Sequence, residues 1–175
     1  MTESWLLDAQ HPREYHSVKV RSAREFILRM TTGADVFHAI QQFAIDHRIR
    51  FAKIHAAFMG GLQPARFLVW APDTNDPENW HHEEPMEVSN LSMILALGGI
   101  IHSREVNGEE EPFPSIHFVM GGAWNVPTIG GHLLDGSIVK GVFELFITEI
   151  DGIDVIYGPR FGENFPENWY KEVES

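Results

Sequence analysis

Residues 128–136, TIGGHLLDG, decide how the chain can be interpreted, because two adjacent glycines stand directly before a histidine. This arrangement is typical of a phosphate-binding loop, of a turn that presents a metal ligand, or of a tight turn in a packed sheet. The phosphate role fails because no Lys-Ser or Lys-Thr follows the glycines, and no third spaced glycine completes a dinucleotide motif. The residues that follow are strand-like, so no helix N-terminus would face an anion. We expect the glycines to turn the chain into its last long strand and to present His132.

Length and composition limit the class of protein. The 175 residues suffice for one domain with a single hydrophobic core, and a hydrophobic share of 43% is typical of a globular chain. The net charge of -12 disfavours direct binding to nucleic acid and to anionic membranes, both of which attract clustered Lys and Arg. The absence of cysteine excludes disulfides, thiol catalysis and thiolate zinc sites.

The chain shows no targeting or membrane-spanning pattern. Its first residues contain no apolar core of a signal peptide, and the longest apolar run, LSMILALGGII at 91–101, is too short to cross a bilayer. We therefore expect a cytoplasmic protein that does not bind membranes.

Hydrophobic periodicity predicts one main helix and a series of strands. The helix is expected within 31–47, with Thr32 as its N-cap and with Val36 and Ile40 on its apolar face. Strands are predicted at 24–30, 49–61, 65–71, 86–103, 114–122, 137–150 and 153–158. The long segment 86–103 should bend near Asn90 or at Gly98 and Gly99. One helix against a mostly antiparallel sheet is an α+β fold.

The expected domain organisation has three parts. An N-terminal arm covers 1–20, the main domain covers 21–150, and a C-terminal hairpin strand and tail cover 151–175. The tail shows no periodicity, and we expect it to pack over a surface through Phe161, Phe165 and Trp169.

Three histidines form a candidate metal site. Asn107-Gly108 predicts a hairpin, and if it closes near 109–110, His102 and His117 lie roughly opposite each other. His132 would be the third ligand, and three histidines with one water form an open zinc geometry. The alternative is three unrelated polar residues, because a slip of one residue in register sends His102 to the other face of the sheet.

Two further residues are candidates for a role beside that site. Glu144 interrupts an apolar strand, so its carboxylate should be paired, ligated or protonated. It would either orient a ligand histidine from the second shell of the metal or form a hydrogen bond on the sheet face. His55 is a reserve ligand, or an ordinary polar residue beside Lys53.

The ordered motifs resemble the PPC (plant and prokaryote conserved) domain family over about residues 22–150. The similarity covers REFILRMTTGADVFHAIQQFAIDHRIRFAKIHAAFMGGLQPARF, EPMEVSNLSMILAL, IHFVMGG and IGGHLLDGSIVKGVFELFI. The resemblance implies one helix packed on an antiparallel, highly twisted sheet, and assembly as a homotrimer. Plant members carry AT-hooks and act on nuclear DNA, whereas stand-alone prokaryotic members are commonly described as DNA-binding without a defined biochemical role. No Arg-Gly-Arg-Pro hook occurs in this sequence.

The resemblance also implies a zinc site. Some prokaryotic members are thought to hold zinc through the Gly-Gly-His-Leu histidine and a His-x-His pair on the preceding strand. His132 and His117 match this pattern, whereas Ser115 stands where the first histidine of the pair would be. We expect His102 to substitute for it from across the hairpin.

Two functional hypotheses follow. The first is a homotrimeric PPC-type binding or regulatory module with an unidentified small-molecule or protein ligand and a histidine zinc site. The alternative is a metal-dependent enzyme acting on a small molecule, with zinc on His102, His117 and His132 and with Glu144 or His55 as the proton carrier.

Overall fold

The computed structural model describes residues 18–76, 80–122, 128–159 and 166–173. The chain divides into two compact units. One unit spans Ser22–Ile150, and the other consists of the two ends, Met1–Arg21 and Asp151–Ser175. Within the described residues, no helix has the length and apolar character needed to cross a membrane.

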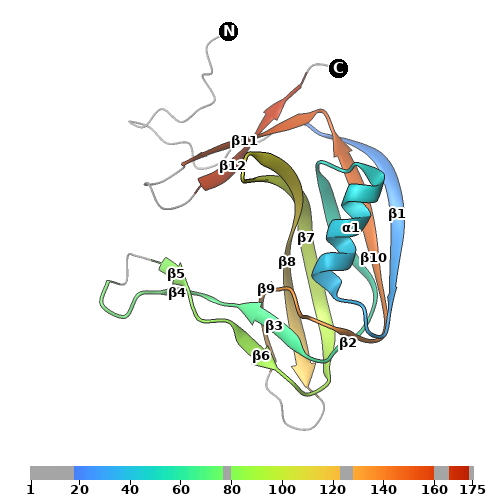
Figure 1. The fold of residues 1–175 in the computed structure, drawn as a ribbon, viewed down its shortest axis with the longest axis vertical. Coiled ribbons are helices and arrows are strands. Elements are labelled where there is room, and N and C mark those ends of the chain that lie inside the picture. Colours follow the sequence, from blue (N-terminus) through green and yellow to red (C-terminus); the bar gives the residue numbers. More distant parts are fainter. Residues whose placement is uncertain (1–17, 77–79, 123–127, 160–165, 174–175) are drawn as a thin grey trace. The chain divides into compact units, whose positions relative to one another are not determined.

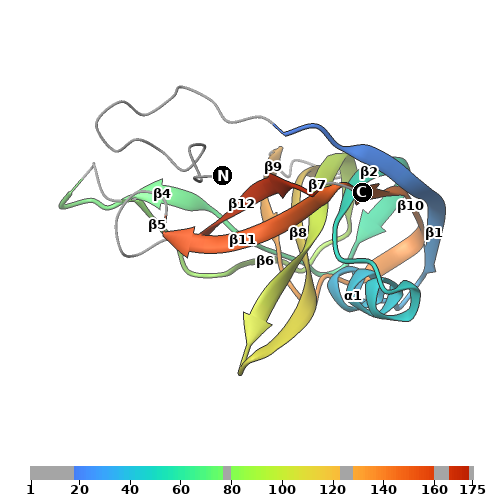
Figure 2. The same cartoon turned by 90° about the horizontal axis from the view of Figure 1, so that it is seen from above.

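The first unit is an eight-stranded sheet with one helix against it (Figures 1 and 2). Its elements are β1 (Arg21–Thr31), α1 (Val36–His47), β2 (Ala52–Leu62), β3 (Ala65–Leu68), β6 (Met86–Val88), β7 (Ser92–Val106), β8 (Glu109–Gly122), β9 (Ile129–Leu133) and β10 (Val139–Asp151). The strand order is β1-β10-β2-β7-β8-β9-β3-β6, and every pair from β10 to β6 is antiparallel. The predicted α+β arrangement is confirmed.

Helix α1 begins one turn later than the sequence suggested. Asp35 is the N-cap, in an extended conformation, and its Oδ1 accepts a hydrogen bond from the backbone N–H of His38 at 3.2 Å. The prediction of Thr32 as the cap is wrong, because the Thr32 hydroxyl bonds the backbone of Gly141 instead. Val36, Ile40 and Ala44 recur every four residues, so the helix buries them on one face against the sheet.

The expected turn at Gly130-Gly131 is a strand. Both glycines lie within β9, which is hydrogen-bonded between β8 and β3. A Cβ at Gly130 would overlap the backbone oxygen of Phe118, and one at Gly131 would overlap the backbone oxygen of Leu68. The glycines are therefore required by close backbone approach on both sides of the strand. The turn follows at 134–136, where Gly136 has a φ of +80°.

The hairpin of β7 and β8 closes at the predicted Asn107-Gly108 turn. Both residues have positive φ, 54° and 83°, and Val106 pairs directly with Glu109. The bend expected in the preceding segment lies near Asn90, the first of its two predicted places, because β6 ends at Val88 and β7 then runs through both central glycines. The close approach of Gly99 to the backbone of Ser115 explains one of those glycines.

The hydrophobic core lies between α1 and the sheet. Its largest fully buried side chains come from α1 and from strands across the whole sheet; they include Phe67, Phe143, Ile40, Ile54, Leu62, Ile101, Ile116, Met120, Leu133, Leu145 and Ile147. Phe67 and Phe118 meet edge to face with centroids 5.7 Å apart, which joins β3 to β8 beneath the glycines of β9.

Two short antiparallel pairs complete the described structure. In the first, β4 (Trp70–Pro72) pairs with β5 (Trp80–His82), and β5 lies within the turn-rich segment 72–85. In the second unit, β11 (Ile153–Pro159) pairs with β12 (Pro166–Glu172). The expectation of an aperiodic tail is therefore wrong at 166–172, where cross-strand hydrogen bonding makes a strand. Phe161 and Phe165 lie outside the described residues.

Candidate functional site

The structure brings His117 and His132 together on neighbouring strands. His117 of β8 is the direct cross-strand partner of His132 of β9, and their ring centroids are 5.3 Å apart at an angle of 82°. Their neighbours Ile116 and Leu133 are fully buried in the core, so strand alternation directs both histidines to the opposite face. His117 is exposed and His132 is half-buried.

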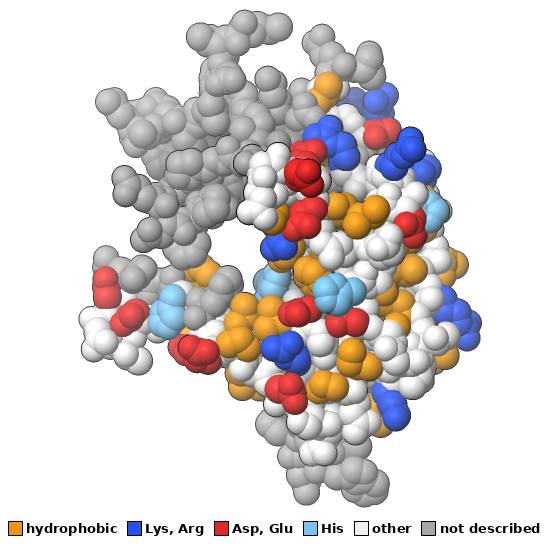
Figure 3. All heavy atoms as spheres, viewed as in Figure 1, with side chains coloured by type: hydrophobic (Ala, Val, Ile, Leu, Met, Phe, Trp, Pro, Cys, Tyr) orange, Lys and Arg blue, Asp and Glu red, His pale blue; other side chains and the backbone are white. Residues whose placement is uncertain are grey.

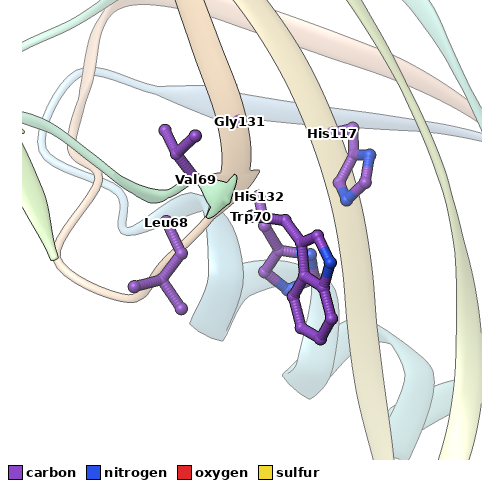
Figure 4. A pocket seen from close by; sticks show the side chains of 6 residues that line it. All are labelled: Leu68, Val69, Trp70, His117, Gly131 and His132. Carbon is purple, nitrogen blue, oxygen red and sulfur yellow. The ribbon is translucent and has the colours of Figure 1, made fainter. Parts of the chain in front are cut away.

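A small cavity of about 230 Å³ opens beside the histidine pair (Figure 4). Its other walls are Leu68, Val69, Trp70 and Gly131. Leu68 at the end of β3 pairs directly with His132, and Trp70 follows two residues later at the start of β4. Apart from the imidazoles and the indole N–H, these side chains are apolar, so the two histidines dominate the chemistry of the cavity.

The separation of the two rings fits a shared metal ion. Two imidazoles bound to one tetrahedral zinc ion, with Zn–N bonds of about 2.0–2.1 Å, have centroids roughly 5 Å apart. His117 and His132 match that separation. Among the described residues, however, no group of three His, Asp or Glu side chains is placed to hold a metal ion. The chain therefore supplies two ligands as it stands, and a metal would need other atoms in its remaining positions.

His102 does not face His117, contrary to the expected hairpin register. Because the turn is the two-residue Asn107-Gly108, His102 pairs with Phe113, and His117 pairs with Gly98. The His102 ring meets Phe113 with centroids 5.4 Å apart, and Phe113 lies nearly parallel to His132 with centroids 6.4 Å apart. Phe113 thus contacts both histidines. The predicted ligand role of His102 has no support from this register.

Burial lowers the pKa of His102 below its ordinary value, the hydrogen bond to the backbone of Ser103 partly opposes this shift, and the positive charge of Arg104 adds a smaller lowering effect. In that hydrogen bond, the Nδ1 atom lies 3.0 Å from the backbone oxygen of Ser103. The oxygen can only accept, so Nδ1 carries the proton. His102 is therefore held in its neutral form by the fold.

This shift predicts a pH-dependent part of the folding stability. Between the lowered pKa and about 6.5, the unfolded chain carries a proton on His102 that the folded chain lacks. The contribution is fully present above about 6.5 and is lost as pH falls through the lowered pKa. Urea unfolding of the parent and of His102→Gln should give free energies of unfolding whose difference narrows on acidification below pH 6.5. Parallel pH profiles would contradict this prediction.

The two residues expected beside the metal site lie elsewhere in the sheet. The Glu144 carboxylate on β10 forms an ion pair with Arg29 of β1, with Oε1 and Nη1 2.7 Å apart. The strands β2 and β7 separate β10 from β8. His55 of β2 pairs with Gly98 of β7, so one strand separates it from His117. The hydrogen-bonding alternative for Glu144 is the one observed.

Sequence reasoning missed Trp70 and Phe113, the two aromatic residues that contact the histidines or share their cavity. Trp70 lies near the end of an apolar run that stops at Pro72, and Phe113 lies between two prolines on the returning strand. Neither pattern indicates a binding site, because the strand register that places both residues is set by the complete sheet.

Charge is distributed without a basic surface in Figure 3. Among the described residues drawn there, Lys and Arg side chains are scattered over the face together with acidic ones. Several are also neutralised locally, as in the pairs Arg29–Glu144, Arg66–Glu87 and Arg104–Glu111. Such a surface does not favour binding to a phosphate backbone.

Comparison with known proteins identifies the family. The model of the Plants and Prokaryotes Conserved (PCC) domain, which is also abbreviated PPC, matches residues 18–151. No curated protein matches the chain.

Three solved structures share the fold. A PPC protein of Pyrococcus horikoshii is 18% identical, with a TM-score of 0.69 over 92% of this chain and 100% of the other. A protein of Archaeoglobus fulgidus described as metal-containing is 24% identical, with a TM-score of 0.60 over 78% and 86%. A Bacteroides thetaiotaomicron protein described as "putative dna binding" is 18% identical, with a TM-score of 0.61 over 87% and 97%. The match to the family model covers most of the sequence, and the chain therefore belongs to the PCC domain family.

Proposed function

We propose that the chain is a homotrimeric binding module whose site is the cavity of His117 and His132 and whose ligand is a divalent transition metal, best fitted by zinc. The observation that carries the proposal is the direct cross-strand pair of imidazoles with centroids 5.3 Å apart. Neutral imidazole nitrogen is a preferred zinc ligand, and the chain has no cysteine to compete for the ion. A relative described as metal-containing shares the fold.

In this site, each histidine would give one ring nitrogen to the ion, which would supply Lewis-acid character and an open coordination position. The chain's own residues would orient the two rings. The backbone pairing of β8 with β9 fixes their separation, and the nearly parallel Phe113 ring limits the rotation of His132. Trp70 and the aliphatic walls would restrict access of water to the open position.

Large exposed apolar side chains support the trimer. Phe58 on β2, Leu95 on β7 and Phe146 on β10 are 62%, 58% and 46% exposed. Exposed apolar residues on neighbouring strands are typical of surfaces that contact another protein. Light scattering should give three chains per particle, and a monomer across the concentration range would contradict this part of the proposal.

Metal analysis tests the site. Untagged protein purified without added zinc, then equilibrated with zinc and desalted, should retain about one ion per chain. Less than about a tenth of an equivalent, with no uptake on titration, would contradict the proposed metal site.

No specific observation favours the enzyme alternative or a DNA-binding role. The enzyme alternative needs a proton carrier, but Glu144 is paired with Arg29, and His55 is separated from His117 by a strand. A DNA-binding role belongs to the description of certain relatives, and the net charge of -12 opposes it in this chain.

A further inference from the structure

A second and larger cavity, the helix–hairpin pocket, lies where α1, the β7–β8 hairpin and the segment 132–135 meet. Its volume is about 480 Å³, and its walls include Phe37 and Gln41 of α1, Arg104, Glu111 and Phe113 of the hairpin, and Asp135. Small-molecule sites typically have volumes of about 300–1,000 Å³. His132 lines this pocket as well as the cavity of the histidine pair.

The apolar part of the pocket is aromatic. Phe113 is half-buried and meets Phe37 at 71°, with ring centroids 5.4 Å apart. The Arg104 guanidinium lies 4.3 Å from the Phe113 centroid, so the cation already occupies one approach to that ring. An angled pair of half-buried rings offers one flat contact surface and one edge contact. A small aromatic ring fits such a wall.

The polar part of the pocket presents an excess of hydrogen-bond acceptors. Arg104 donates from Nε and Nη2 to the same oxygen of Glu111, Oε1, at 3.2 and 3.0 Å. The other oxygen of Glu111 takes no part in that ion pair. Gln41 donates its amide to the backbone oxygen of Pro112 at 3.0 Å, which leaves its own carbonyl oxygen as an acceptor.

The charges that face the pocket favour a cation. Glu111 neutralises Arg104, and Asp135 adds a second carboxylate at the rim, with its Oδ1 4.0 Å from Arg66. The remaining titratable groups on the lining are His38 and His132. The charged side chains of the lining are one base, Arg104, and two acids, Glu111 and Asp135, in a chain whose net charge is -12. A ligand carboxylate would have to displace Glu111 from Arg104 and would be repelled by Asp135.

We propose that the helix–hairpin pocket binds a small, flat aromatic cation of the amidine class. Its ring packs against Phe37 and Phe113, and its N–H groups donate to the carbonyl of Gln41 and the free oxygen of Glu111. The inference goes beyond the proposed metal function and requires no metal ion.

Benzamidine and benzoate test this proposal, because they have nearly the same shape and opposite charge. The full chain, kept free of metal by a chelator, is titrated with each compound and followed by isothermal calorimetry and by amide shifts in 15N NMR spectra. Benzamidine should bind saturably, with shifts centred on Gln41 and Phe113, and at least about tenfold more tightly than benzoate. Benzoate binding as tightly, or benzamidine failing to saturate in the millimolar range, would overturn the proposal.

Three variants separate the ligand contacts from effects on folding. Glu111→Gln should reduce the preference for benzamidine over benzoate, because it removes one carboxylate and releases Arg104. Phe113→Leu should weaken the binding of both compounds. Glu83 is an exposed acid between β5 and β6, so Glu83→Gln is the charge-matched control. It should leave the affinities for benzamidine and for benzoate unchanged. The Arg104–Glu111 pair is well exposed and contributes little to stability, so Glu111→Gln should remain folded. An unchanged preference in a folded Glu111→Gln variant would overturn the assignment of Glu111.

Discussion

Replacing Gly130 with alanine is expected to lower the free energy of unfolding by at least about 3 kcal/mol, a large share of the roughly 5–15 kcal/mol by which native proteins are stable. The new Cβ would overlap the backbone oxygen of Phe118 and would also press on the backbone of Val119 at 2.9 Å. Both are main-chain atoms of the neighbouring strand, so no side-chain rotation can relieve the overlap. Strand β9 would have to separate from β8, and the pairing of His132 with His117 would be lost.

Gly98→Ala is the matched control, because it also changes a strand glycine on this sheet. The nearest atom to its new Cβ is the backbone oxygen of Ile54, at 3.9 Å, an ordinary contact. Chemical denaturation of both variants checks the prediction. A stability loss for Gly130→Ala no larger than that for Gly98→Ala would show that β9 is not held as closely as the structure indicates.

Substituting either histidine of the pair is expected to lower zinc affinity by at least about 100-fold, since even residues that only orient metal ligands contribute about 10–100-fold. His117→Ala and His132→Ala each remove one of the two imidazoles that the chain brings together. His117 is exposed, so its substitution should leave stability nearly unchanged. Competition titration against a chromogenic chelator measures the affinities.

Two other histidines serve as controls for that measurement. His81→Ala alters a histidine of β5 that lies beside Glu83, and it should leave zinc affinity unchanged. His102→Ala tests the ligand role expected from the hairpin register. We expect a change below about threefold, because the His102 ring is seated on Phe113 rather than opposite His117. If His102→Ala lowered the zinc affinity as strongly as His132→Ala, His102 would be a ligand and the two-histidine site would be wrong.

Local patterns predicted the elements of this fold better than their register. The alternation of apolar residues located most of the strands but not β5, β9 or β12, and Asn107-Gly108 located the hairpin turn. Both signals depend on residues near one another in sequence. The same pattern could not distinguish closure at 107–108 from closure at 109–110. That difference of two residues moved the partner of His102 from His117 to Phe113.

Gly130 and Gly131 also show that a local sequence pattern does not predict contacts between strands. Gly-Gly before His132 predicted a turn, because glycine's freedom at positive φ is its commonest local use. Here the pair lies in a strand, and its reason is the backbone of β8 and β3 on either side, which no local pattern records. His117 and His132, which the resemblance named together, are neighbours on adjacent strands, whereas the aromatic residues around them came only from the packed structure.

The most direct test of the proposed function is the anomalous diffraction of zinc-grown crystals, measured on both sides of the zinc absorption edge. The proposal predicts an edge-dependent peak between the ring nitrogens of His117 and His132, about 2.0–2.1 Å from each. Peaks confined to other sites, with both imidazoles free of metal in crystals that contain bound zinc, would contradict it.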